Sequence, residues 1–291
     1  MDAPTPNPVL DPGLTGQDAR PVDGVENGYL AGYRVRFDEA GPDGNLRTSA
    51  LLRYAQDIAW RHSEHLGFDR EWYRERGLGW VVRGVELELS APIPLGTTLR
   101  VSTAVVGHRR IWARRLGECR FADDRLAARI TTDWVLLDGR GRIVRIPADF
   151  GVAFTNPEVR SEILRVPAED GAPTARHGLT VRPSDLDPID HVNNAIYVDW
   201  LEEAIEAVGW SAVASGGGDA DRPAGVADGP PTATGSSPGT LRIEYLASAA
   251  RGDAIEVDLY GGAESCRARI GRSDGLELVR AARDLSRSSS G

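Results

Sequence analysis

The sequence predicts an α+β fold in which one unit, a long helix packed on an antiparallel sheet, occurs twice. Two observations support this prediction. The order strand, helix and then several strands runs through the first half of the chain and begins again after residue 178. The chain also repeats itself, because residues 35–57, moved along by 146 positions, align without a gap on residues 181–203.

Identity between the two copies is low, so the shared order of elements is what makes a duplication convincing. The copies differ at two polar positions. Where the second copy has Asp187 and His191, the first has Gly41 and Asn45. If this motif is catalytic, only the second copy keeps it, and the first contributes sheet and the binding cavity. Matching positions include Pro42 and Pro188, Leu46 and Val192, Tyr54 and Trp200, Asp57 and Glu203, and the turn glycines Gly96 and Gly252.

In the first half, residues 29–37 alternate apolar and polar side chains, which predicts a strand. Thr48 and Ser49 can cap a helix that runs to about His65. Its expected buried face consists of Leu51, Leu52, Ala55, Ile58 and Ala59. Further strands are expected at 80–89, 98–106, 112–121 and 126–137, separated by turns.

In the second half, a short strand is expected at 178–182 and a helix at 192–208. Four strands follow, at 241–246, 254–260, 265–271 and 276–285. This gives a disordered tail at 1–27, an N-terminal unit at 28–155, a linker at 156–175 and a C-terminal unit at 176–287. Residues 211–239 are mostly Gly, Ala, Pro and Ser, and we expect them to form a disordered insertion.

Composition excludes several classes of protein. The net charge of −9 argues against binding of nucleic acid through phosphate contacts. All basic side chains are Arg, which removes mechanisms that need a lysine, such as Schiff bases and Walker-type phosphate loops. No apolar run approaches the roughly 18–20 residues of a membrane span, and the N-terminus lacks the pattern of a secretory signal. With only two cysteines, we expect a reducing, cytoplasmic location.

The stretch SDLDPIDHVNNAIYVDWLEEA, residues 184–204, concentrates polar groups directly before a helix. The first turn of a helix offers free backbone N–H groups that can hold a developing oxyanion. Asp187 at this place could attack a carbonyl, or take a proton from a water that does. His191 could orient that carboxylate or protonate a leaving thiolate.

The other polar side chains of the stretch have several readings. Asn193 and Asn194 could bond a substrate or fix the loop, and Glu203 could point the same way from the far end of the helix or face solvent. A purely structural reading also exists, in which Asp187 or Asp190 caps the helix and the asparagines satisfy a turn.

The stretch resembles the D-x-D-x-x-x-H-V-N-N-x-x-Y-x-x-W-x-x-E signature of hotdog-fold thioesterases. Residues 29–285 as a whole resemble the double-hotdog acyl-ACP thioesterases (ACP, acyl carrier protein). In the first half, YRVRFDEAGPDGNLRTSALLRYAQDIAW, WVVRGVELEL and ARITTDWVLLDGRGRIVRIP share the family's features. The resemblance implies a tandem double hotdog, in which each half is a long helix wrapped by an antiparallel sheet.

The resemblance also implies an activity. Asp187 and His191 would hydrolyse the thioester of an acyl chain held in a tunnel between helix and sheet, with the asparagines ordering the site. The partner would be an acyl carrier protein loaded with an acyl chain, or acyl-CoA. No metal or organic cofactor is implied, and the protein could be a monomer, because two fused copies already form the pair, or a homodimer.

Two departures from the family pattern concern catalysis. Plant-type members carry an Asn where this chain has Ile189, and a Glu-Cys pair where it has Ser248 and Ala249. The mechanism is therefore expected to centre on Asp187, and no cysteine nucleophile is expected. The rivals are a CoA or polyketide-chain thioesterase, and a non-catalytic protein that binds acyl thioesters.

Other features of the sequence have a purely structural interpretation as well as a functional one. Residues 107–115 are basic and could dock an acidic carrier protein, or simply be arginines facing solvent. His62 and His65 lack a third partner for a metal site. Cys119, Cys266, Trp80, Trp134 and Trp200 are expected to pack in the core.

Overall fold

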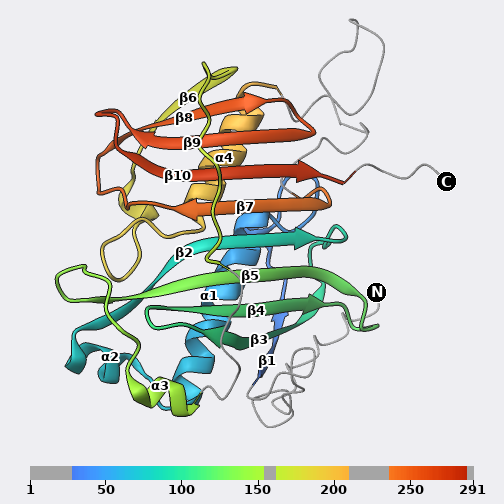
Figure 1. Cartoon of the computed structure of the whole chain (residues 1–291). Coiled ribbons are helices and arrows are strands. Elements are labelled where there is room, and N and C mark those ends of the chain that lie inside the picture. Colours follow the sequence, from blue (N-terminus) through green and yellow to red (C-terminus); the bar gives the residue numbers. More distant parts are fainter. Residues whose placement is uncertain (1–27, 154–161, 210–235, 287–291) are drawn as a thin grey trace, which may run out of the picture.

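The computed structural model describes residues 28–153, 162–209 and 236–286. Its centre is one ten-stranded antiparallel sheet in the order β1-β3-β4-β5-β2-β7-β10-β9-β8-β6 (Figure 1). The strands of the N-terminal half are β1 (Tyr29–Arg34), β2 (Leu78–Leu89), β3 (Thr98–His108), β4 (Trp112–Arg120) and β5 (Leu126–Asp138). Those of the C-terminal half are β6 (Ala175–Thr180), β7 (Gly239–Tyr245), β8 (Ala254–Gly261), β9 (Ser265–Arg272) and β10 (Glu277–Leu285).

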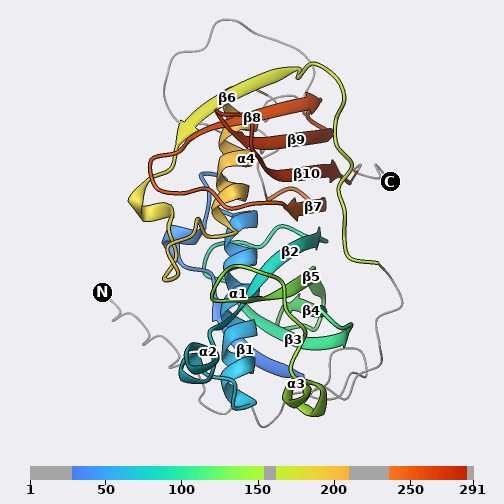
Figure 2. The same ribbon diagram turned by 60° about the vertical axis from the view of Figure 1, so that its left-hand side comes forward.

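Two long helices cover one face of the sheet. Helices α1 (Thr48–His65) and α4 (Ile196–Ala207) follow one another along this inner face, as Figure 2 shows. Strands β2 and β7 pair at the middle of the sheet, from Gly84 opposite Glu244 to Leu89 opposite Gly239. The predicted double-hotdog arrangement is thus confirmed, with both halves joined in one sheet.

The repeat with an offset of 146 residues recurs in the hydrogen bonds. The bridge between Ala40 and Leu46 returns as the bridge between Leu186 and Val192. The turn between them is closed by Gly41 N donating to Asn45 O at 2.8 Å, and in the second copy by Asp187 N donating to His191 O at 2.8 Å. Equivalent side-chain bonds precede each turn, from Arg36 N to Glu39 Oε2 and from Arg182 N to Asp185 Oδ2.

One hydrophobic core runs through both halves. The buried face of α1 includes Leu51, Leu52 and Ile58, and that of α4 includes Trp200 and Leu201. Burying a side chain of this size stabilises the fold by roughly 1.5–3 kcal/mol. Where the helices meet, Arg53 and Asp199, which are equivalent residues of the two copies, form an ion pair at 2.5 Å.

The predicted helices and strands differ from the observed ones mainly at their ends. Helix α4 begins at Ile196 rather than at residue 192, because residues 192–195 form a turn before it. Two short helices were not predicted, α2 (Arg70–Arg76) and α3 (Ala148–Ala153). Helix α2 is fixed by its ends, since the side chain of Asp69 accepts from Trp72 N and Gly77 takes a left-handed conformation.

The linker crosses the outer face of the sheet, opposite the helices (Figure 1). We call its residues 162–174 the strap; the expected linker at 156–175 ends earlier, because Ala175 already belongs to β6. Leu164 N donates to Asp133 Oδ2 at 2.7 Å, and the strap packs so closely that a Cβ on Gly84 would lie 3.0 Å from Leu164 Cβ. The strap therefore ties the two halves together.

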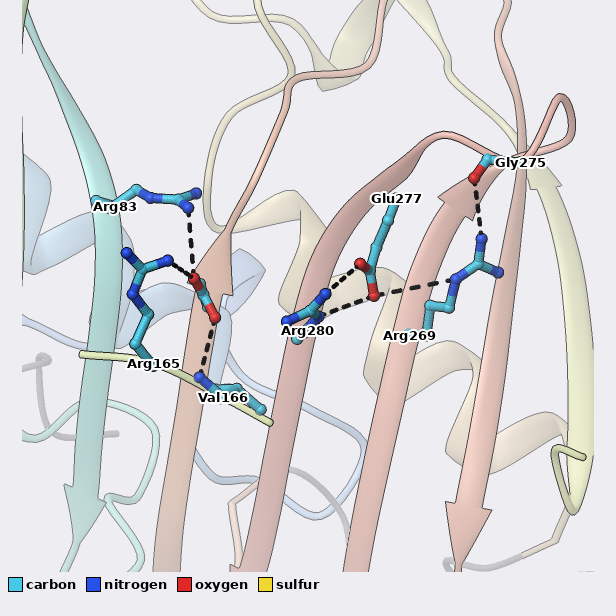
Figure 3. A network of polar contacts seen from close by, with 8 residues as sticks. Arg83, Arg165, Val166, Arg269, Gly275, Glu277 and Arg280 are labelled. Carbon is cyan, nitrogen blue, oxygen red and sulfur yellow. Dashed lines mark hydrogen bonds and ion pairs between the residues drawn. The ribbon is translucent and has the colours of Figure 1, made fainter. Parts of the chain in front are cut away.

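The carboxylate of Glu244 on β7 is the main anchor of the strap. It is 1% exposed and accepts from Arg83, Arg165 and the backbone N–H of Val166 (Figure 3). Arg83 comes from β2, so this one side chain connects the strap with both central strands. A buried carboxylate needs such donors, because an unpaired one would carry a large desolvation cost.

Parts of the predicted organisation lie outside the described residues. These are the expected tail at 1–27, the end of the N-terminal unit and the start of the linker at 154–161, and most of the expected insertion at 211–239. The insertion ends earlier than expected, because Ser236 is buried and Gly239 opens β7. Among the described helices, none is long and apolar enough to cross a membrane.

We expect Glu244→Gln to lower the free energy of unfolding by about 1–3 kcal/mol, because the strap and β2 lose a charged acceptor inside the protein. Urea denaturation measures this change. The control is Glu256→Gln on β8. The side chain of Glu256 is 41% exposed, and its Oε2 lies as far as 3.8 Å from Nη1 of Arg176. This substitution should change the free energy of unfolding by less than about 0.5 kcal/mol. Equal effects of the two substitutions would contradict the anchoring role.

Candidate active site

The loop from Asp187 to His191 is held by the carboxylate of its first residue. Asp187 Oδ1 accepts from Ile189 N at 2.9 Å and from His191 N at 3.3 Å. Asp190 completes the tight turn with a positive φ of 61°, a conformation that Asp tolerates better than most residues. These bonds fix one oxygen of Asp187 and leave Oδ2 without a hydrogen bond among the described residues.

Asn193 connects the loop to helix α4. Its Oδ1 accepts from Ala195 N at 2.9 Å, and its own N–H donates to Asp185 O at 2.9 Å. The side-chain oxygen thus caps the turn that leads into the helix, which leaves the Nδ2 donors of the amide for another partner. Asn194 is held through its carbonyl, which accepts from Tyr245 Oη at 2.9 Å.

A cavity of about 700 Å³ opens beside this loop. Most of its wall comes from the N-terminal half, from α1, α2 and the inner face of β2, β3, β4 and β5. The C-terminal half contributes only Asp187, Pro188, Ile189 and Asn193. The apolar and aromatic lining from the N-terminal half consists of Ala59, Trp60, Tyr73, Leu78, Trp80, Val105, Ala113, Trp134, Ile146 and Phe150, and the loop adds Pro188 and Ile189. One half thus supplies the cavity, and the other supplies the polar loop at its edge.

The predicted site residues do not all meet at this cavity. Asp187 and Asn193 line it, whereas the side chain of His191 is exposed and neither His191 nor Asn194 belongs to the wall. Glu203 lies on the exposed side of α4, where its Oε1 is 3.3 Å from Nε2 of His177 on β6. The catalytic roles of His191, Asn194 and Glu203 stay predictions.

Several polar residues of the wall were not singled out from the sequence. Gln56 on α1 faces the cavity, and its amide has no hydrogen-bond partner among the described residues. Arg115 and Ser63 also reach the wall, as do His108 and the exposed arginines Arg70 and Arg74. The internal repeat could have drawn attention to Gln56, because the equivalent helix position in the second copy is also polar, Glu202. Arg115 belongs to the basic stretch 107–115, which the sequence marked as a possible docking surface. Its place in the cavity wall could not be predicted, since a strand pattern does not show which face is hollow.

The equivalent place on the other side of the molecule is closed. Thr48, Glu202 and Arg283 line a space of only about 20 Å³ there. Burial raises the pKa of Glu202 to about 7, although Arg283 opposes this shift. Among the described residues, the two copies thus differ at this place: the large cavity lies beside the loop that carries Asp187, and the space near Glu202 is small.

The remaining sequence features have structural roles. Cys119 and Cys266 are buried in β4 and β9, as expected. Of the basic stretch 107–115, Arg114 pairs with Asp133 and Arg115 points inward, so only part of it could dock a partner. His62 is buried and stacks on Tyr29. Within the described residues, no group of three or more His, Cys, Asp or Glu side chains could hold a metal ion.

Solved structures show the class of this fold. The chain is similar to an acyl-ACP thioesterase from Bacteroides thetaiotaomicron, with a TM-score of 0.71 at 14% identity over 89% of this chain and 98% of that one. It is also similar to a 12:0-ACP thioesterase from Umbellularia californica, with a TM-score of 0.71 at 22% identity over 89% and 97%. The architecture is thus that of double-hotdog proteins.

Sequence comparison identifies the family. Residues 26–153 match the acyl-ACP thioesterase N-terminal domain and residues 169–209 match the C-terminal domain, together more than half of the chain. The chain therefore belongs to the acyl-ACP thioesterase family.

The curated relatives are distant from this chain in sequence. An oleoyl-acyl carrier protein thioesterase of Arabidopsis thaliana, chloroplastic by name, is 27% identical over 199 residues, which are 61% of this chain and 54% of that protein. A dodecanoyl-[acyl-carrier-protein] hydrolase of Cinnamomum camphora is 28% identical over 193 residues, which are 60% and 50%. The chain spans about half the length of the curated relatives it matches.

We expect both cysteines of the native protein to resist alkylation. Burial raises the pKa of Cys119 to about 12 and that of Cys266 to about 11, so both stay protonated and shielded at pH 8, and the thiolate is the reactive form. Labelling with iodoacetamide at pH 8 should be at least about 100-fold slower than in the unfolded chain. Ser248→Cys, at an exposed position, is the control that should label quickly. Rapid labelling of Cys119 would contradict its place in the core.

Proposed function

We propose that this protein hydrolyses the thioester bond between an acyl chain and an acyl carrier protein. The observation that carries the proposal is the position of Asp187, whose carboxylate is fixed at the edge of a large, mostly apolar cavity. Such a cavity suits an acyl chain, and a carboxylate at its edge suits attack on the carbonyl at the end of that chain. Membership of the acyl-ACP thioesterase family supports the same reaction.

The proposed chemistry uses the free oxygen of Asp187. As a base, Oδ2 takes a proton from a water whose oxygen bonds to the thioester carbon; the C–S bond then breaks and the leaving thiolate receives the proton. As a nucleophile, the carboxylate attacks the carbon itself and the C–S bond breaks to release the thiolate. Water then cleaves the resulting anhydride to the free acid and the Asp187 carboxylate, and the proton released goes to the thiolate. Both routes begin from the geometry described above.

The developing oxyanion needs donors near the carbonyl. The Nδ2 amide of Asn193 is available, because its Oδ1 is already used as a cap, and Gln56 offers a second amide from the other half. In this proposal, His191 orders the loop through its backbone, and its side chain could protonate the leaving group only after moving. Glu203 acts on the surface of α4, away from the reaction.

The identity of the substrate is also part of the proposal. The names of the relatives favour an acyl carrier protein over CoA as the carrier. An acyl-CoA or a polyketide chain would fit the same cavity. A cytosolic location and a monomeric or dimeric state stay predictions from the sequence.

Asp187→Asn should lower turnover of acyl-ACP by roughly 10²–10⁴-fold, because the side chain keeps its hydrogen bonds to the loop and loses its basicity. Thiol release from a panel of medium- and long-chain acyl-ACPs and acyl-CoAs measures the effect.

The matched control is Asp190→Asn in the same loop. Asp190 is exposed and outside the cavity wall, and Asn also tolerates its positive φ, so activity should change less than about twofold. An Asp187→Asn enzyme with unchanged rates would end the proposed mechanism. Binding of acyl thioesters without release by the wild type would instead favour the non-catalytic reading suggested by Ile189, Ser248 and Ala249.

A substitution in the wall should change the preferred chain length. Ala113 on β4 faces the cavity, and Ala113→Leu places three further carbon atoms in the space that the acyl chain would fill. We expect kcat/KM for the longest accepted chain to fall about tenfold or more, with a smaller loss for chains shorter by several methylenes. Ala113→Gly is the control and should keep the preference. A uniform loss over all lengths would mean that Ala113 does not contact the chain.

A further inference from the structure

The guanidinium of Arg115 lies half-buried in the wall of the cavity, without a carboxylate partner among the described residues. Its Nη1 donates to His62 Nδ1 at 2.8 Å and to Thr103 Oγ1 at 3.4 Å. The neighbouring arginines of β4 are different: Arg114 pairs with Asp133, and Arg120 pairs with Glu118. Since a guanidinium has only donors, His62 must accept through Nδ1 and carry its proton on Nε2.

Burial lowers the pKa of Arg115 to about 10, so the side chain is still charged at neutral pH. A charge in such a place is costly unless hydrogen bonds surround it. The two bonds from Nη1 leave Nη2 and Nε without acceptors among the described residues. Arg115 lines the cavity and also a smaller space of about 10 Å³ that it shares with Thr103. Water can therefore satisfy these donors from either space, whereas a ligand in the cavity can do so only from the cavity side.

Arg115 belongs to the end of the cavity that lies away from Asp187. Its partners are Thr103 on β3 and His62, which stacks on Tyr29 of β1. Strands β3 and β1 lie on the far side of β4 from the C-terminal half, which supplies Asp187 (Figure 1). An acyl chain with its thioester at Asp187 would therefore approach Arg115 with its distal part.

Other polar groups are found in the same wall. The hydroxyl of Ser63 donates its proton to Phe68 O at 2.8 Å. In the 2.9 Å bond between Ser63 Oγ and Tyr73 Oη, the tyrosine hydroxyl is therefore the donor. The indole Nε1–H of Trp134 is buried and has no acceptor among the described residues. A cavity for a purely aliphatic chain needs none of these groups. A plain chain that displaced water from Arg115 would leave a charged donor unsatisfied, whereas an oxygen atom on the chain would accept from it.

We propose that the cavity selects acyl chains that carry an oxygen acceptor, a hydroxyl, keto or carboxylate group, in their distal half, and that Arg115 is the residue that recognises it. Arg115 is thus a specificity-determining residue of the wall. This inference rests on the proposed thioesterase function and narrows its substrate to oxygenated acyl chains.

The test compares thioesters of one chain length that are plain or carry a distal hydroxyl, keto or carboxylate group. We expect the wild type to hydrolyse at least one oxygenated chain with a kcat/KM about tenfold or more above that of the plain chain. Arg115→Met, which is apolar and of similar length, should abolish this preference, so that the ratio of kcat/KM for the oxygenated and the plain chain falls to about one. A wild type that prefers the plain chain, or a preference unchanged in Arg115→Met, overturns the inference and leaves the thioesterase function standing.

A binding measurement separates the two proposals. Calorimetry with the monoamide of dodecanedioate and with dodecanamide needs no turnover, and these two ligands differ only in the distal carboxylate. The wild type should bind the monoamide about tenfold or more tighter, with the difference lost in Arg115→Met. If no thioester is hydrolysed but this difference is found, the hydrolase proposal fails and the recognition by Arg115 stands. If Arg115→Met does not fold, Arg115→Gln keeps a donor for His62 and removes the charge, and it should reduce the same difference.

Discussion

The pairing of β2 with β7 is the contact on which the rest of the structure depends. It turns two sheets into one, and it sets α1 and α4 along a single inner face over one core. The N-terminal half forms most of the cavity wall, and a loop of the C-terminal half lies at the cavity's edge. The cavity therefore exists only while β2 and β7 are paired. The strap and Glu244 reinforce this junction from the outer face, where a buried carboxylate collects donors from β2 and from the strap.

Much of the fold was predictable from the sequence, because strand alternation and the offset of 146 residues are signals that local sequence carries. The first helix was expected to have Thr48 and Ser49 as its cap and to run to about His65. It ends there, but Thr48 and Ser49 already belong to it and Arg47 is the cap residue. Helix α4 begins four residues late because the side chain of Asn193 caps a turn rather than the helix. Helix α2 was missed because seven residues carry little periodicity, and its Asp69 cap is informative only once the helix is known.

The candidate site was predictable in part. Asp187 and Asn193 meet at the cavity, since neighbours in sequence share a loop. Arg115 and Gln56 could not be found in this way, because they come from β4 and α1, far from that loop in the chain. For Glu203, helical spacing from His191 left two directions open, towards the site or towards solvent. The side chain lies on the exposed side of α4 and pairs with His177, and its catalytic role stays a prediction.

The ion pair between Arg53 and Asp199 has a consequence for assembly. These residues are equivalent in the two copies and face each other where the copies meet. In a symmetric dimer of single units, the residue on the two-fold axis meets itself, so it cannot meet an opposite charge. With two fused copies, the same position can hold a cation on one side and an anion on the other. If two N-terminal halves paired with each other, they would bring two copies of Arg53 together. The ion pair therefore favours pairing of the N-terminal half with the C-terminal half of the same chain. Because the pair is exposed, it adds little to stability itself.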